Sequence, residues 1–414
     1  MSDKLEISET SDTPSNGSIE NIDSNNSQNL KLNNDKVPFS IWLVLISIFL
    51  GKVCAGAASI IFPITLKGMG TLSNAVIGAI LSAEAFSIII FSPMIGSMIG
   101  KLGVIGSVIA GSLGRIAVVV PLIYIDNIYA WIVGIFVYGI SSNLIGIAYQ
   151  TWIGSANLKS KRGLVMAWYL GGMSSGLALG PILLNLFGAS SARMLGFLIV
   201  AGLSLSSLIP VIFLLKCNPP FKGGSKPRIL FIIKNGKKIM FGSFIGGVIL
   251  WGVPAFMAIY GMAAGMKPEQ AAILLTMFQF GGFIAGPILS WVSDKFEDRH
   301  NVVIISFFAS LLCSLFLPIA IKNLIFAYAL LFIWGGAVQG VYSGCMTLLG
   351  DVFRKEDQMS ASVAFTQVKA IGGLIGIGAI GLAMDWASSE GMIYVIVIAS
   401  LAYFTFALSQ IKVQ

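Results

Sequence analysis

Charged residues, histidine and paired cysteines are scarce in this sequence, and each shortage excludes a class of protein. Only 11% of the 414 residues are Asp, Glu, Lys or Arg, whereas a soluble domain carries about a quarter. His300 is the single histidine and the four cysteines form no C-x-x-C pair, so we expect no metal site and no disulfide framework. A Walker-type phosphate loop and a catalytic triad are also missing, so we expect neither an enzyme nor a bound cofactor.

Apolar residues take the place of the missing charges. They make up 56% of the sequence, and the mean hydropathy is +0.88. Long apolar stretches of about 20 residues are typical of helices that cross a bilayer. The net charge of +8 does not indicate nucleic-acid binding, because most Lys and Arg residues lie in short loops between apolar segments. The lipid bilayer is therefore the expected surrounding.

Twelve apolar segments predict an all-α integral membrane protein with about twelve transmembrane helices. Their edges are uncertain by a few residues. The predicted spans are 39–63, 75–98, 104–125, 129–153, 162–186, 191–215, 238–264, 268–292, 301–320, 323–349, 359–384 and 390–411.

Two polar regions divide the chain. Residues 1–37 are rich in Ser, Asn, Asp and Glu and contain no apolar run, which predicts a disordered cytoplasmic tail. The longest later interruption, 216–237, is basic and contains paired prolines and glycines. It predicts a central cytoplasmic loop between two six-helix halves, 38–215 and 238–414.

The basic residues predict the orientation of the chain. With the N-terminus inside, nineteen of the 26 Lys and Arg residues fall on the cytoplasmic side, four fall outside and three lie within spans. Cytoplasmic loops carry the excess of basic residues in membrane proteins. Both termini are therefore expected in the cytoplasm.

An internal repeat relates the two halves. The same three residue types recur at the ends of the second and eighth spans. In each copy a proline is followed by a small residue three positions later and by a lysine eight positions later, and the same number of residues separates the matching members of the two copies: Pro93, Gly96, Lys101 and Pro287, Ser290, Lys295. Three matches in register indicate duplicated halves in the same orientation, related by an axis along the membrane normal.

The second copy of this motif also resembles a known family. Residues 290–299 resemble the cytoplasmic loop signature of the major facilitator superfamily, Gly-x-x-x-Asp-Arg/Lys followed by basic residues. The first half carries a degraded copy, in which Gly100 stands where the Asp is expected. Residues 150–153 with 161–163, and 287–299, are similar to the bacterial YcaD-like branch. The resemblance implies the major facilitator fold, a secondary transporter and no cofactor.

The loop signature suits a gate at the cytoplasmic side. An acidic group at a helix end can pair with a basic residue or a helix N-terminus, and both contacts break when the halves rock. We therefore expect gating roles for Asp294, Lys295 and Arg299, with Lys101 as the counterpart in the first half. The alternative is that these residues only anchor the helix ends at the membrane interface.

Glycines recur at every fourth position in the fifth and eleventh spans, at Gly172, Gly176 and Gly180 and at Gly372 and Gly376. This spacing predicts one helix face that allows close backbone packing. In the family it resembles, the fifth helix of each half packs against the opposite half.

Four charged residues fall near the middle of predicted spans: Lys52, Glu84, Arg115 and Lys369. Each costs roughly 2.5–3.5 kcal/mol at the centre of a membrane helix, so each needs a partner, a wet cavity or a function. Three positive charges against one negative leave an excess that an anionic substrate would neutralise.

The resemblance implies that the first, fourth, seventh and tenth helices line a cavity and that the second, fifth, eighth and eleventh flank it. Lys52 and Lys369 are therefore the expected substrate contacts. Arg115 lies on an outer helix, where a structural ion pair with Glu84 is favoured. Glu84 is the only acidic residue deep in a span; it is a candidate for proton coupling, and the alternative is a permanent pair with Arg115 or Lys52.

Uncharged polar side chains in or beside the cavity helices complete the expected substrate site: Asn143, Gln339 and Gln367. The alternative for each is ordinary packing between helices.

Together these features predict a monomeric, multi-pass transporter of the cell inner membrane, most simply a proton symporter that takes up a small organic anion or zwitterion by alternating access. One alternative is an exporter of a drug, siderophore or other metabolite, since fold does not determine function. Another is a sensor or scaffold with a transporter fold and no flux.

Overall fold

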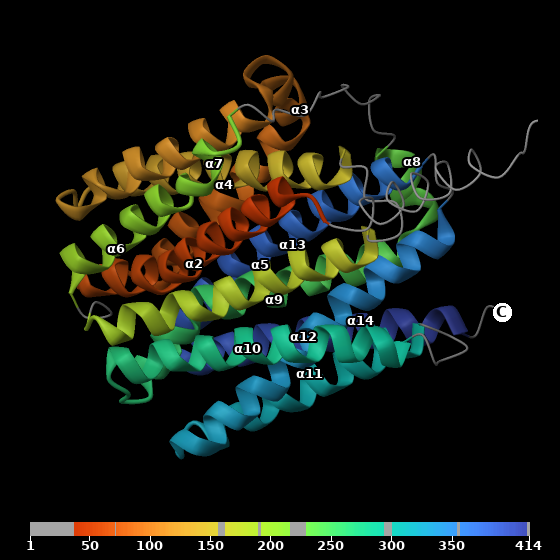
Figure 1. The fold of residues 1–414 in the computed structure, drawn as a ribbon. Helices are drawn as coiled ribbons and strands as arrows, with labels where there is room; N and C mark the ends of the chain where they lie inside the picture. Colours follow the sequence, from red (N-terminus) through yellow and green to blue (C-terminus); the bar gives the residue numbers. More distant parts are fainter. Residues whose placement is uncertain are drawn as a thin grey trace, which may run out of the picture. The chain divides into compact units, whose positions relative to one another are not determined.

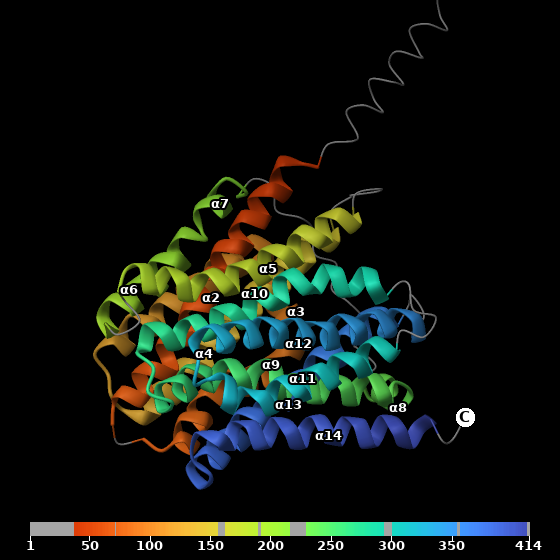
Figure 2. The ribbon, with the colours of Figure 1, turned by 90° about the horizontal axis from the view of Figure 1, so that it is seen from below.

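The computed structural model describes residues 37–70, 72–155, 162–188, 192–215, 229–293, 300–353 and 357–411. Within these ranges all regular elements are helices, which run side by side in one compact unit, Ser40–Gln414 (Figures 1 and 2). The predicted tail and most of the predicted central loop lie outside the described residues.

The helices of the first six predicted spans follow one another with short connections. They are α2 (Phe39–Gly68), α3 (Asn74–Val119), the 3₁₀ turn η1 (Pro121–Ile123), α4 (Ile128–Ser155), α5 (Arg162–Leu186), α6 (Arg193–Ser206) and α7 (Ile209–Ile212).

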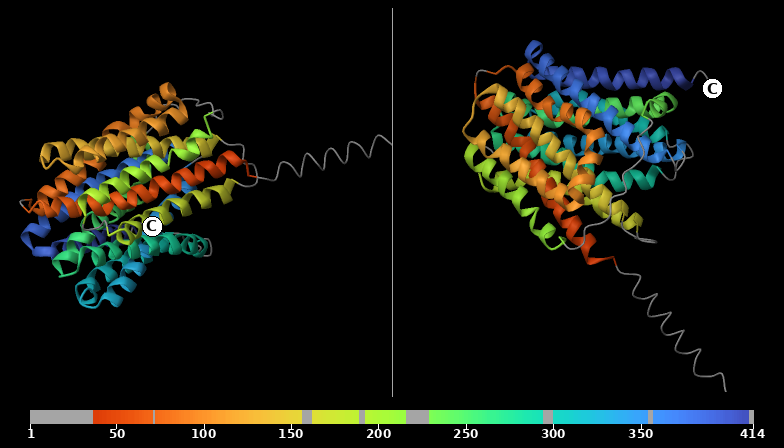
Figure 3. Two further views of the ribbon diagram at one scale, coloured as in Figure 1. Left: turned by 60° about the vertical axis from the view of Figure 1, so that its left-hand side comes forward. Right: turned by 90° about the horizontal axis from the view of Figure 1, so that it is seen from above.

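The helices of the last six predicted spans repeat this pattern. They are α8 (Ile229–Asn235), α9 (Lys237–Ala263), α10 (Pro268–Ser293), α11 (His300–Ala320), α12 (Leu324–Val352), α13 (Gln358–Trp386), the 3₁₀ turn η3 (Ser388–Glu390) and α14 (Gly391–Ile411). Figure 3 shows the bundle from two further sides; in its right-hand view α14, in dark blue, lies along one edge.

All twelve predicted spans coincide largely with helical residues. In the described ranges, nine helical segments are long and apolar enough to cross a membrane, and one of them, Asn74–Ile123, covers two predicted spans. The helices α5 and α10 are not among the nine. The protein is a multi-pass membrane protein with an all-helical fold.

Gly103 separates the second and third spans within α3. Its φ of 73° and ψ of 169° are non-helical and break the otherwise continuous helix. A side chain is strained at such a positive φ, so glycine is the residue that fits this position. The predicted break at 99–103 is confirmed as a local kink.

A short helix occupies the end of the predicted central loop. α8 begins at Ile229, and its Ile232 is fully buried. The apolar run from Ile229 to Ile233 explains why these residues fold against α9 and α13 and do not remain a loop. The prediction of a loop to residue 237 is therefore wrong for 229–235.

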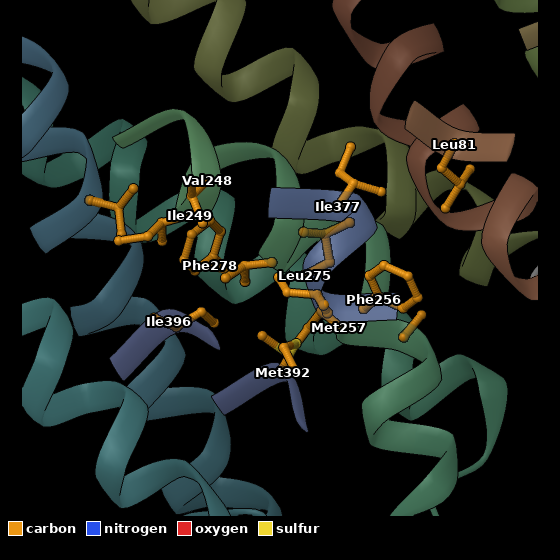
Figure 4. Close-up of a cluster of buried hydrophobic side chains, with 14 of the residues drawn as sticks. Leu81, Val248, Ile249, Phe256, Met257, Leu275, Phe278, Ile377, Met392 and Ile396 are labelled. Atoms are coloured by element: carbon orange, nitrogen blue, oxygen red, sulfur yellow. The ribbon is translucent and has the colours of Figure 1, made fainter. Parts of the chain in front are cut away.

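Two helix pairs join the first six spans to the last six. The α3 helix packs against α13, and α5 packs against α10. At the first of these contacts Leu81 of α3 belongs to the same buried cluster as Phe256 of α9 and Ile377 of α13 (Figure 4). These pairs agree with the contacts that the family resemblance implied for the fifth and eleventh helices.

The repeated glycines pack elsewhere. A Cβ on Gly176 or Gly180 would collide with the backbone of α2, near Phe49 and Ala57. Those on Gly372 and Gly376 would collide with the backbone of α9. The glycine faces therefore seat the fifth and eleventh helices on neighbours in their own half, and other faces of these helices meet the opposite half.

The Gly180→Ala substitution tests this packing. The added methyl group meets backbone atoms of Val53, Gly56 and Ala57, which cannot rotate away, so we expect a loss of about 1–3 kcal/mol in stability. A fall in the melting temperature of the purified protein in detergent would show it. Gly202→Ala is the control, because its Cβ meets nothing within 4 Å; equal melting temperatures for the two variants would contradict the packing.

Candidate functional site

Lys52 lies in the middle of α2, where its helix is pressed against α5. A Cβ on Gly176 would lie 2.7 Å from the Lys52 Cβ, so the glycine leaves room for the lysine stem. The Lys52 side chain is partly accessible although protein surrounds it on all sides. It therefore faces the interior of the bundle. We use the word hollow below only for the partly accessible interior at Lys52, Glu84 and Lys369. The charges of Arg115, Glu84 and Lys369 act on the Lys52 ammonium group.

Arg115 is the most buried of the four charges, with 3% of its surface exposed. Its Nε donates a hydrogen bond to Ser142 Oγ at 3.0 Å, and its Nη1 donates to the Gly51 carbonyl at 3.3 Å. The guanidinium carbon also lies 5.4 Å from the centre of the Tyr138 ring, within the range of a cation–π interaction. These neutral partners tie α3 to both α2 and α4.

The predicted ion pair between Arg115 and Glu84 is not a direct one. In the described part of the chain, the one ion pair within 4 Å joins Arg193 to Asp126. Glu84 interacts with Arg115 and Lys52 over a longer distance. The physical reason is that Arg115 is already held by Ser142 and a backbone carbonyl, which need no carboxylate.

Glu84 is positioned by the contact between α3 and α4. A Cβ on Gly139 would lie 2.9 Å from the Glu84 Cα and carbonyl oxygen, so this glycine lets the two helices touch at Glu84. Ser87 Oγ donates to the Glu84 carbonyl at 2.7 Å. Glu84 is enclosed by protein but partly accessible.

Lys369 approaches the hollow from the last six spans. Its backbone lies against Gly247 of α9, and its Nζ is 4.6 Å from the centre of the Tyr342 ring of α12. The lysine also lines a small pocket with Ser243 and Phe365, which has room for about one water molecule. Lys369 is partly accessible and surrounded by protein, as Lys52 is.

The polar residues predicted beside the lysines differ in what surrounds them. Asn143 on α4 has a buried Nδ2 with no hydrogen-bond partner among the described residues. Gln339 of α12 lies beside Gly282 of α10. A Cβ added to Gly282 would lie 3.6 Å from the Cβ of Gln339. Gln367 is partly accessible on α13, two positions before Lys369. Of the three, Asn143 is the one with a buried donor that lacks an acceptor among the described residues.

Most of the predicted gate is not described. Asp294, Lys295 and Arg299 lie outside the described residues. Lys101 is exposed on α3, two residues before the kink at Gly103. Gating at this end of the bundle stays a prediction.

The sequence prediction missed the partners of Arg115. Tyr138 and Ser142 are four positions apart on α4, and therefore lie on one face of the helix. Two polar side chains at this spacing, in a helix next to one that carries a membrane-embedded arginine, are the sequence signal that could have indicated the partners of Arg115. Gly51 contributes through its backbone carbonyl, which leaves no trace in the sequence.

The site therefore combines three cations and one carboxylate from α2, α3 and α13. Residues 42–376 and 239–412 match the model of the Major Facilitator Superfamily. The chain belongs to the major facilitator superfamily.

Individual relatives in this superfamily are distant. The chain is 23% identical over 247 residues to "Uncharacterized MFS-type transporter YfkF" of Bacillus subtilis (strain 168), covering 58% of this chain and 62% of that protein. It is 23% identical over 161 residues to "4-hydroxybenzoate transporter PcaK" of Pseudomonas putida, covering 38% of this chain and 36% of that one. The matched region thus spans about three fifths or less of these relatives.

Solved structures share the major facilitator fold. The nucleoside transporter NupG superimposes with a TM-score of 0.71 at 15% identity, over 90% of this chain and 98% of that one. A point mutant of the same transporter gives a TM-score of 0.73 at 14% identity, over 90% and 99%. The resemblance to the YcaD-like branch stays a prediction.

The Arg115→Lys substitution tests the structural role of Arg115. Lysine keeps the charge but lacks the planar fork that reaches both Ser142 and the Gly51 carbonyl. We expect a loss of about 1–3 kcal/mol in stability, measured as a lower melting temperature in detergent. Lys101→Gln, at an exposed site, is the control, with an expected change below about 0.5 kcal/mol. An Arg115→Lys protein as stable as the native one would contradict the structural role.

Proposed function

We propose that the protein is a secondary active transporter that takes up a small organic anion or zwitterion by alternating access, coupled to protons. The observation that supports this most is the enclosed cluster of Lys52, Arg115, Glu84 and Lys369, in which positive charges outnumber the negative one. Lys52 and Lys369 come from opposite sets of six spans, yet interact electrostatically.

The charge balance favours an anion. The single carboxylate, Glu84, offsets one cation, and Arg115 is held by hydrogen bonds within its own half. The ammonium groups of Lys52 and Lys369 then repel each other across the hollow. A carboxylate bound between them would replace this repulsion with two charge-assisted hydrogen bonds, which are about twice as strong as neutral ones.

Aromatic groups lie beside Lys369, and the amide group of Asn143 lies on α4 in the first half. The ring of Tyr342 lies under Lys369, and Phe365 is 5.8 Å from that ring between centres. The Asn143 amide nitrogen has a hydrogen to donate. These groups suit an organic anion with an apolar body. The Pseudomonas putida relative is named for 4-hydroxybenzoate, an anion of this kind.

Glu84 supports proton coupling. Burial favours the protonated carboxyl group, whereas Arg115 and Lys52 favour the carboxylate. Among the described residues, no ion pair within 4 Å holds the Glu84 side chain in its charged form. A carboxyl group balanced in this way, beside a substrate lysine, can take up a proton at one membrane face and release it at the other.

The excess of basic residues in alternate loops supports an inner-membrane location with both termini in the cytoplasm. The same count of basic residues predicts that the end of the bundle where α2 ends and α3 begins is external. We call it the loop-1 end below. The candidate gate at Lys101, Asp294, Lys295 and Arg299 then faces the cytoplasm, and we propose a monomer as the transporting unit.

Uptake into proteoliposomes tests the substrate site. Lys52→Gln and Lys369→Gln each remove one charged contact, so we expect the rate constant kcat/KM for a transported anion to fall about tenfold or more. Labelled aromatic carboxylates, including 4-hydroxybenzoate, and nucleosides form the panel, with and without a pH gradient. Lys322→Gln is the control, because Lys322 is exposed and lies outside both the substrate site and the candidate gate. Unchanged anion uptake in both site variants would refute the assignment of the two lysines.

Glu84→Gln separates coupling from structure. The neutral amide cannot exchange a proton, so we expect accumulation driven by a pH gradient to be lost while exchange of labelled for unlabelled substrate continues. Both are measured in the same proteoliposome preparation. Accumulation at the native level in Glu84→Gln would show that the proton passes elsewhere or that no proton is coupled.

A further inference from the structure

Asp385, which none of the sequence motifs singled out, joins the two sets of spans at the loop-1 end. It is the second-last residue of α13, and its carboxylate accepts hydrogen bonds from the backbone N–H groups of Asn74 and Ala75, each at 2.8 Å. These are the first residues of α3, whose N-terminus carries the positive end of the helix dipole. The contact therefore joins an acidic side chain of one half to a helix start of the other.

The other interface between the halves has a contact at the equivalent place. Asn185 is the second-last residue of α5, and its Nδ2 donates to the carbonyl of Glu269, the second residue of α10, at 2.9 Å. Gly372, Gly376 and Asp385 follow Gly172, Gly176 and Asn185 at one constant separation. The helix starts Asn74 and Pro268 share the separation of Pro93 and Pro287. The duplication thus places both side chains at matching positions.

The two contacts differ in strength. Asp385 brings a full negative charge to two backbone donors at a helix start, whereas Asn185 brings a neutral amide to one carbonyl. Charge-assisted hydrogen bonds are about twice as strong as neutral ones. Asp385 is also exposed, so water can replace its partners when the helices separate. Such a contact is strong enough to favour the closed state of the loop-1 end and weak enough to break in each transport cycle.

Neighbouring backbones are close when this contact is made. A Cβ on Gly78, one turn into α3, would lie 2.9 Å from the Ile377 carbonyl of α13. Lys67, at the end of α2, donates to Asn74 Oδ1 at 3.0 Å. The loop-1 end is therefore closed in this structure along the α3–α13 interface.

We propose that Asp385 is the latch of the external gate: its bonds to the start of α3 hold the loop-1 end closed, and their release lets the hollow open to that side. The inference rests on the proposed alternating access. It assigns to Asp385 a positioning role in the cycle, since the side chain acts on the spacing of two helices and not on substrate.

Distances across the loop-1 end test the latch without any substrate. Tyr129 and Ile325, at the starts of α4 and α12, are 78% and 77% exposed, and each is replaced by a spin-labelled cysteine in a background free of native cysteines. Pulsed electron paramagnetic resonance then gives the distance distribution. In Asp385→Asn we expect a longer-distance population, with the open-to-closed ratio raised about five- to tenfold.

Glu390→Gln is the matched control. It removes a negative charge at the same end, but Glu390 accepts from Tyr260 within the last six spans, so the distances should stay native. A native distribution in Asp385→Asn, or the same shift in Glu390→Gln, would overturn the latch. Because no substrate is added, failure of the anion assignment leaves this result standing.

A cross-linked variant covers the case in which Asp385→Asn does not fold. Ala75→Cys and Asp385→Cys together place two thiols at the contact. We expect their disulfide to stop the exchange of labelled for unlabelled substrate and a thiol reductant to restore it. Equal exchange in the oxidised and reduced protein would show that exchange proceeds without opening of the contact, and would overturn the proposal.

Discussion

The cost of charge inside an apolar bundle is the constraint from which the arrangement of this protein follows. Each ionised group at mid-membrane costs roughly 2.5–3.5 kcal/mol on insertion scales, and four of them are retained here. Arg115 meets this cost with hydrogen bonds to Ser142 and the Gly51 carbonyl. Lys52, Glu84 and Lys369 lack such direct polar partners among the described residues and face the hollow. That contrast is the basis for the proposed division between a charge that holds helices together, Arg115, and charges that meet substrate and proton.

Glycines make this arrangement of charges possible. Gly176, Gly139 and Gly247 lie against the backbones or stems of Lys52, Glu84 and Lys369, respectively. At each place the absence of a Cβ lets a neighbouring helix approach, so that the charged side chain is enclosed by protein and kept from lipid. Helix packing in a membrane gains little from the hydrophobic effect and depends on such close contact. The positions of these glycines and of the enclosed charged residues therefore depend on each other.

The sequence predicted the spans well because apolar runs are bounded by charges and turn residues. The kink at Gly103 and the two interfaces between the halves also agreed with prediction. It did not predict which face of α5 or α13 meets which neighbour, because these helices are apolar on nearly all sides and their patterns carry little directional information. The direct Arg115–Glu84 pair was wrong for a related reason: a neutral hydroxyl and a backbone carbonyl replaced the expected carboxylate, and neither stands out in a sequence.

The two predicted halves carry different chemistry at matching places in the sequence. Asp385 accepts from the start of α3, whereas Asn185 donates to the start of α10. The central hollow has a similar asymmetry, because Glu84 and Arg115 lie in the first half and Lys369 with Tyr342 in the second. Identical contacts at both interfaces would favour separation of both to the same degree. The charged contact lies on the α3–α13 pair, the same pair that carries Glu84 and Lys369. Under the proposed latch, movement of that pair changes the proposed gate and the spacing of the central charges together.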